Sequence, residues 1–135
     1  MPSNLNSVAG GTASITVAEQ VLAVLGPVNL NLPSGAQEQG YQLEATVVGV
    51  GTASTTGIIL RIRAGSGTGG AALVTSPTLP VAGAVGFSES LNWLDATMLG
   101  LGVIAETYTL TAAMVGAASG AWTATFDGQA ATAAS

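Results

Sequence analysis

Histidine, cysteine and lysine are absent from this 135-residue sequence, and charged residues of any kind make up only 7% of it. A chain without these three residue types cannot build a Ser-His-Asp triad, a cysteine nucleophile, a Schiff-base lysine or a zinc site of His and Cys ligands. We therefore expect a non-enzymatic protein that holds no cofactor and no metal. The remaining route to catalysis is a pair of carboxylates.

Positive charge is the scarcest property of the chain. Two arginines stand against seven acidic residues, which gives a net charge of −5. Because no basic cluster exists to displace counterions from a phosphate backbone, nucleic acid is excluded as a partner. Solubility then depends on Ser, Thr, Asn and Gln, and a weakly polar surface of this kind is cheap to desolvate, which favours contacts with other proteins.

The sequence shows no recognisable targeting signal. The first seven residues contain no basic residue and no apolar run follows them, so they do not resemble a signal peptide. The longest nearly uncharged apolar stretch, residues 98–105, is too short and too rich in glycine to span a bilayer. We expect synthesis in the cytoplasm and no membrane partner. Without cysteine, the redox compartment cannot be inferred.

What the sequence does contain is typical of strands joined by turns. Hydrophobic residues make up 48% of it, mostly small and aliphatic, and glycine occurs 19 times. Apolar residues alternate with polar ones over several strand-length segments, most clearly 41–50, 58–64, 85–91, 108–114 and 122–126. The pattern predicts an all-β fold: a two-sheet antiparallel β-sandwich or jelly roll of about eight strands.

Three regions follow from the same pattern. Residues 1–12 are rich in Asn, Ser and Gly and are expected to form an N-terminal arm or flexible lead-in. Residues 13–128 form the β-sandwich domain, and residues 129–135 lack bulk and are expected to be a flexible C-terminal tail. Within the domain, Gly26-Pro27 is expected to end one strand before the next begins.

The segment 65–70 matches the glycine spacing GxGxxG of dinucleotide-binding folds. That motif requires a helix after the last glycine, whereas β-branched residues and Pro77 follow here. We interpret it as a flexible hairpin loop.

Arg61 and Arg63 are two residues apart and are therefore expected on one face of a strand. One interpretation is cross-strand pairing with Glu44 or Glu89, which contributes at most about 1 kcal/mol for each exposed pair. The other is an anchoring contact with an acidic neighbouring subunit, since the planar guanidinium pairs bidentately with carboxylates.

The two tryptophans differ in context. Trp122 lies in strand alternation and is expected in the core. Trp93 lies in an irregular segment, 93–103, which we expect to be a loop, together with Leu99. Trp93 is therefore the better candidate for an interface.

The acidic residues are scattered singly along the chain. Glu89 and Asp95 are the closest pair that could flank a cleft, but neither lies in a recognisable motif. We expect ordinary solvated or ion-paired carboxylates.

A family resemblance rests on three segments: the run from Ile59 to Gly70, Phe87-Ser88-Glu89-Ser90-Leu91, and Glu106 to Ala112. They resemble small jelly-roll proteins of tailed bacteriophage heads, over roughly residues 13–127. The resemblance implies a capsid decoration (cement) protein or a head-fibre module located on the virion surface. The implied partner is the major capsid protein, and a homotrimer is the favoured oligomer. No catalytic residue carries over.

From this role we expect oligomer contacts through Arg61, Arg63, Trp93 and Leu99, with residues 1–12 becoming ordered on binding. Two other functions stay open. A carbohydrate- or receptor-binding module predicts an exposed Trp93 or Tyr41 beside polar side chains. A carboxylate-based glycosidase predicts two carboxyl groups roughly 5 to 10 Å apart in a cleft.

Overall fold

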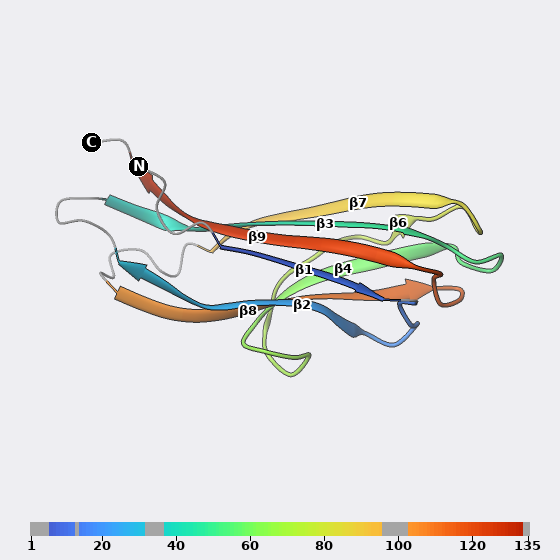
Figure 1. The fold of residues 1–135 in the computed structure, drawn as a ribbon, viewed down its shortest axis with the longest axis horizontal. Helices are drawn as coiled ribbons and strands as arrows, with labels where there is room; N and C mark the ends of the chain where they lie inside the picture. Colours follow the sequence, from blue (N-terminus) through green and yellow to red (C-terminus); the bar gives the residue numbers. More distant parts are fainter. Residues whose placement is uncertain (1–5, 13, 32–36, 96–102, 134–135) are drawn as a thin grey trace.

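The computed structural model describes residues 6–12, 14–31, 37–95 and 103–133, with side chains described for residues 14–26, 42–94 and 107–128. In these ranges the chain forms strands joined by turns and loops (Figure 1). The described part of the chain contains no helix that could cross a lipid bilayer.

The strands form two antiparallel sheets packed face to face. One sheet has the order β1-β9-β3-β7, and the other has the order β2-β8-β4-β5, with β6 also pairing with β4. The strands run over β1 Asn6–Thr12, β2 Gln20–Asn31, β3 Gln37–Val50, β4 Gly57–Ala64, β5 Ala72–Thr75, β6 Leu79–Pro80, β7 Gly86–Asp95, β8 Val103–Val115 and β9 Trp122–Ala133.

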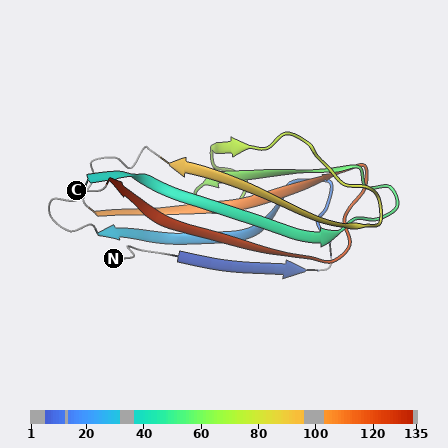
Figure 2. The same cartoon turned by 90° about the horizontal axis from the view of Figure 1, so that it is seen from above.

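The pairing proceeds inward from the two ends of the chain. β1 pairs with β9, β2 with β8, β3 with β7, and β4 with β5. A long antiparallel hairpin that is folded over into two sheets in this way is a jelly roll. The all-β sandwich expected from the alternating pattern is therefore confirmed, and Figure 2 shows the strands running along the length of the molecule.

The core lies between the two sheets and is built from the residues that alternate inward. On β3 the buried side chains are Leu43, Ala45 and Val47, while Glu44 and Val48, which alternate with them, are exposed. Each large aliphatic or aromatic side chain removed from water contributes about 1.5–3 kcal/mol. The largest fully buried side chains come from both sheets and from the β1–β2 connection: Tyr108, Phe126, Ile15, Leu25, Leu43, Ile58, Leu60, Ile62 and Leu110.

Both ends of the sandwich domain extend beyond the boundaries expected from hydrophobicity. Residues 6–12, expected in the arm, form β1 and pair residue by residue with 122–128 of β9. β9 continues to Ala133, so most of the expected tail also belongs to a strand. Backbone hydrogen bonding needs no bulky side chain, which is why small residues gave no strand signal there. Residues 1–5 and 134–135 lie outside the described residues.

The strand expected to end at Gly26-Pro27 does not end there. β2 runs through both residues, and its register against β8 shifts between Leu25 and Val28. Gly26 has a φ of 125°, which a residue with a side chain rarely adopts. The pair therefore forms a β-bulge on an edge strand, one of the few places in a sheet where proline is tolerated.

Candidate functional site

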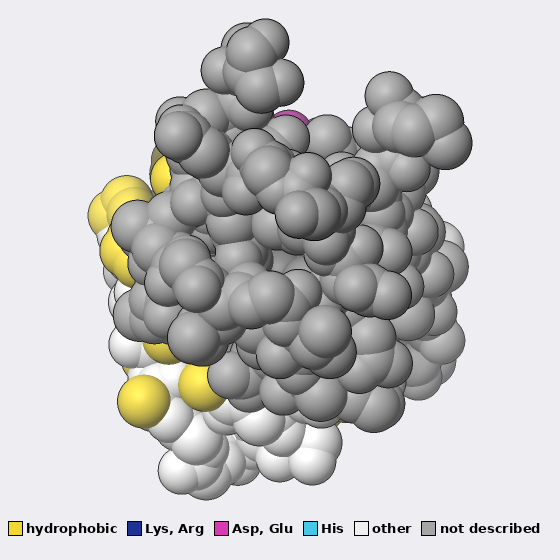
Figure 3. All heavy atoms as spheres, turned by 90° about the vertical axis from the view of Figure 1, so that its left-hand side faces the viewer, with side chains coloured by type: hydrophobic (Ala, Val, Ile, Leu, Met, Phe, Trp, Pro, Cys, Tyr) yellow, Lys and Arg dark blue, Asp and Glu magenta, His cyan; other side chains and the backbone are white. Residues whose placement is uncertain are grey.

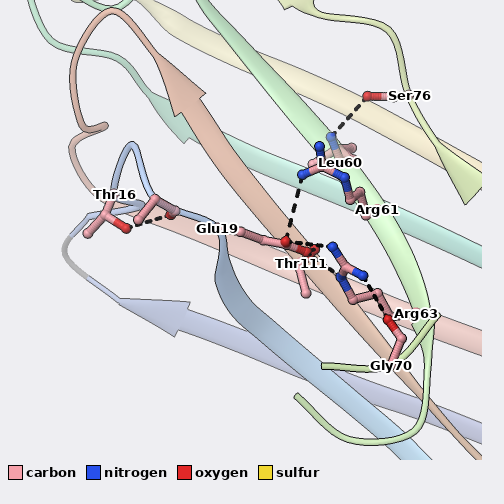
Figure 4. A network of polar contacts seen from close by, with 9 residues as sticks. Thr16, Glu19, Leu60, Arg61, Arg63, Gly70, Ser76 and Thr111 are labelled. Atoms are coloured by element: carbon pink, nitrogen blue, oxygen red, sulfur yellow. Dashed lines mark hydrogen bonds and ion pairs between the residues drawn. The ribbon is translucent and has the colours of Figure 1, made fainter. Parts of the chain in front are cut away.

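The two arginines lie on the outer face of the β2-β8-β4-β5 sheet and point toward Glu19, which precedes β2 (Figure 4). Arg63 binds this carboxylate with two hydrogen bonds: Nε donates to Oε2 at 2.7 Å and Nη2 donates to Oε1 at 2.8 Å. Arg61 lies further away, with Nη1 3.8 Å from Oε1. The Thr111 hydroxyl on β8 also donates to Glu19 Oε2.

This geometry favours the charged form of both partners. The pKa of Glu19 is lowered from 4.5 to about 2, and the hydrogen bonds from Arg63 are the largest cause, against an opposing effect of burial. The Thr111 hydroxyl and the charges of Arg63 and Arg61 contribute to the same lowering. The same contact raises the pKa of Arg63. The carboxylate is ionised at any physiological pH and has no proton to offer a substrate.

The expected partners of the arginines, Glu44 and Glu89, are therefore not the ones found. Glu44 lies on β3 and Glu89 on β7, both in the other sheet. Glu19 lies in the connection between β1 and β2, 44 residues before Arg63. Arg63 already makes its bidentate contact inside the chain. Arg61, with 26% of its side chain exposed and one long contact, retains the less completely engaged positive charge.

The glycine-rich segment 65–70 is the connection between β4 and β5, as the sequence predicted, and it is held against the sheet. Thr109 on β8 donates its hydroxyl proton to the Gly65 carbonyl at 2.6 Å and accepts from the Gly67 amide at 3.1 Å. Arg63 Nη1 donates to the Gly70 carbonyl at 2.7 Å. Thr109 contacts this loop and Thr111 contacts Glu19, and both are fully buried although they lie on the outer side of β8.

The outer face of the other sheet, β1-β9-β3-β7, is different in character. Two of its cross-strand rows consist mostly of short hydroxyl side chains. In one row, Thr46 pairs with Thr125 on one side and with Ser90 on the other. In the next row, Val48 pairs with Thr123 and with Ser88. Val48 and Val50 add apolar area to these rows, with exposed fractions of 47% and 44%. We call this surface the hydroxyl face and define it by Thr46, Val48, Val50, Ser88, Ser90, Thr123 and Thr125.

Two carboxylates that the sequence showed as unrelated are neighbours beside the hydroxyl face. Glu44 on β3 pairs directly with Asp127 on β9, and Asn92 on β7 completes the row. Glu44 is exposed and Asp127 is half-buried. The expected carboxylate pair, Glu89 and Asp95, lies on β7, with Glu89 at an inward register position opposite Val47. Sequence reasoning missed the Glu44–Asp127 row because the pairing of β3 with β9 is not a local property.

The predicted interface residues do not form one patch. Trp93 lies in β7 and not in a loop; it pairs with the buried Leu43 at the edge of the β1-β9-β3-β7 sheet and is 37% exposed. Arg61 and Arg63 lie on the other sheet, and Leu99 is outside the described residues. Hydrophobic side chains are visible along one flank of the end of the molecule in Figure 3. Trp122 is buried, as expected for a core residue.

Neither a protein-family model nor a curated protein matches the sequence. Among solved structures, the chain is similar to the PRD1 vertex protein P5, with a TM-score of 0.57 and 18% identity over 96% of this chain and 97% of that one. It is also similar to a chain from infectious bursal disease virus strain Gx, with a TM-score of 0.51 and 9% identity. That match covers 96% of this chain but 38% of the viral one.

A xylan-binding module, CBM15, aligns over 93% of this chain with 12% identity, but its TM-score of 0.41 is too low to support an argument. At these identities the likeness shows the fold alone: the chain has a jelly roll of the kind found in the two viral proteins.

Proposed function

We propose that this chain is a non-enzymatic structural protein of a phage particle, which binds the outer surface of the capsid through the major capsid protein and stabilises or decorates it. The observation that carries the proposal is the hydroxyl face. It offers a continuous set of short, uncharged side chains across three neighbouring strands.

Such a face suits contact with another folded protein. Short Ser and Thr side chains lose little conformational entropy when they are covered, and uncharged groups cost less to desolvate than ions. The exposed side chains of Val48 and Val50 add apolar area that contributes when water is excluded. Modest binding by each copy is sufficient if several copies act together in an oligomer.

The acidic groups support a structural role over a catalytic one. The negative charge of Glu19 is balanced by Arg63 of the same chain. Glu44 and Asp127 lie beside each other on the outer side of a sheet. A glycosidase needs one carboxylic acid that keeps its proton near neutral pH, and the surroundings of Glu19 act in the opposite direction. The jelly-roll likeness to the PRD1 vertex protein P5 agrees with a place on a virion at the level of fold.

Co-sedimentation with purified phage capsids, before and after expansion, tests the proposal. The wild-type chain should pellet with capsids, and Ser90→Glu, which places a charge in the middle of the hydroxyl face, should weaken binding at least about tenfold. Ser66→Glu is the matched control, because Ser66 is equally exposed but lies in the β4–β5 loop of the other sheet. Circular dichroism melting checks that both variants fold. No pelleting of the wild type, or equal loss in both variants, would reject the proposal.

A second candidate function is a carbohydrate- or receptor-binding module on the virion surface, and one observation favours it. Trp93 is 37% exposed on an edge strand, where an aromatic ring can stack against a sugar. A glycan array probed with the wild-type chain and with Trp93→Ala tests it. Binding that Trp93→Ala abolishes supports the module, and an array without hits removes it.

A further inference from the structure

A sheet edge exposes unpaired backbone amides and carbonyls that can accept a strand from another chain, and natural proteins usually block such edges. In the described part of this chain the edge strands are β1 and β7 in one sheet, and β2 and β5 with β6 in the other. Three of these edges carry blocking features.

The edges of the β2-β8-β4-β5 sheet are interrupted. The register of β2 shifts twice, and the second shift contains Gly26 and Pro27. On the opposite edge, β5 has four residues and β6 has two, with Pro77 between them and Pro80 in β6. Bulges, short strands and prolines all prevent a partner strand from pairing over any length.

The β7 edge is longer, but it contains an acidic residue at an inward register position. Glu89 pairs with the buried Val47 and is itself half-buried. An inward-facing charge blocks edge pairing because a strand added beside it would bury the carboxylate further without a partner.

β1 has none of these features. Its seven residues, Asn6-Ser-Val-Ala-Gly-Gly-Thr12, contain no charge and no proline, and they pair with β9 in unbroken register. Figure 2 shows β1 along one border of the molecule, with no strand drawn beyond it. Among the described strands, it is therefore the edge with no bulge, proline or charge to block an added strand, and part of β1 also lies close to β2 of the other sheet.

We propose that this edge binds β1 of a second copy of the chain, antiparallel and centred on Ala9. The register follows from the sequence. Ala9 lies opposite Ala9 of the second copy, and Val8 lies opposite Gly10, so that the largest residue of the strand meets one without a side chain. Two four-stranded sheets then join into one. Because a twofold axis closes the pair and the other edges are blocked, the assembly ends at a dimer.

The net charge of −5 does not oppose this arrangement at ordinary ionic strength. The acidic residue nearest the shared edge is Asp127, which pairs with Ser7. In the proposed register, the two copies of Asp127 are separated by three strand spacings of about 4.8 Å across the sheet. Along the strands they are separated by four residues of about 3.4 Å each. That places them about 20 Å from each other, twice the screening length of about 10 Å at 0.1 M salt.

The absence of cysteine makes a direct test possible, because a single introduced thiol reports on one position. On oxidation, Ala9→Cys should give a reducible species of twice the monomer mass, since directly opposite residues in antiparallel strands have Cα atoms about 4.5–5.5 Å apart, within disulfide reach. Ser7→Cys is the matched control. Its two copies would lie four residues apart along the strands, about 14 Å, beyond that reach.

An equimolar mixture of Ser7→Cys and Gly11→Cys should cross-link, because these positions lie opposite each other in the proposed register. Sedimentation velocity on the wild-type chain should show a monomer–dimer equilibrium, and not the homotrimer that the family resemblance implies. A strictly monomeric wild type, or Ser7→Cys cross-linking as readily as Ala9→Cys, would overturn the proposal. Neither measurement involves capsids, so the outcome is independent of the proposed function.

Discussion

The contact of Glu19 with Arg63 makes a sharp prediction for acid stability. The change is Glu19→Gln, which keeps the shape of the side chain and removes its charge. In the folded protein the pKa of Glu19 is about 2, against an ordinary value of 4.5. The two pKa values differ by about 2.5, and each pKa unit corresponds to about 1.36 kcal/mol, so the contact would stabilise the fold by about 3.4 kcal/mol. Because 18% of the Glu19 side chain remains exposed, solvent screening reduces our expectation to about 2 kcal/mol.

The sign of the pH dependence follows from the lowered pKa. A carboxylate that is more acidic in the folded state stabilises the fold fully above about pH 5, and this contribution is lost as the pH falls toward 2. Urea unfolding, followed by the fluorescence of Trp93 and Trp122, should therefore show the variant about 2 kcal/mol less stable at pH 7. By pH 2.5 the difference should have fallen to less than half, because Glu19 of the unfolded wild-type chain, with its ordinary pKa of 4.5, is then almost fully protonated.

A double-mutant cycle separates this pair from the other acidic residues. Glu19→Gln combined with Arg63→Gln should lose little more stability than either single variant, because each single change already breaks the same contact. Additive losses would show that the two residues act independently. A difference between wild type and Glu19→Gln that stays constant from pH 7 to pH 2.5 would refute the assignment of the low pKa to this carboxylate.

Three further predictions test the loop, the outer face and the proposed contact. Gly70→Ala should cost about 1–3 kcal/mol in urea unfolding because a Cβ there would overlap the Ala64 carbonyl oxygen, whereas Gly69→Ala, with open space around it, should change stability by less than about 0.5 kcal/mol. Glu44→Gln should raise the stability by about 0.5 kcal/mol at low salt by relieving repulsion from Asp127, and the gain should shrink in 0.5 M NaCl. Capsid binding through the hydroxyl face should weaken less than about threefold between 50 mM and 500 mM NaCl, whereas a contact anchored by charges would weaken strongly.

The parts of the fold that the sequence predicted are those set by local alternation. On β4, Ile58, Leu60 and Ile62 are buried while Arg61 and Arg63 face outward, as the period of two requires. The alternation says which face of a strand is buried, because that depends on the chain's own pleat. It does not say which strand lies alongside.

The parts that the sequence did not predict depend on contacts between distant residues. Glu19 is 44 residues from Arg63 and 92 residues from Thr111, and nothing near Glu19 in the sequence marks it as their partner. The strand β1 was missed for a different reason. Its small residues carry no hydrophobic signal, and it exists as a strand because β9 supplies the hydrogen bonds.

The positions of the charges connect these findings. The chain has two positive side chains, and both lie beside one carboxylate in the connection between the two sheets, where they join this connection to β4 and, through Thr111, to β8. Arg63 therefore contributes to holding the fold, and Arg61 is left as the less engaged charge. On the hydroxyl face and along β1, contacts with other molecules must then rely on shape, backbone hydrogen bonds and the burial of short side chains. Interactions of this kind require a rigid, flat surface, which two packed sheets provide. The scarcity of charge that argues against catalysis would thus also lower the desolvation cost of covering the two contact surfaces that we propose.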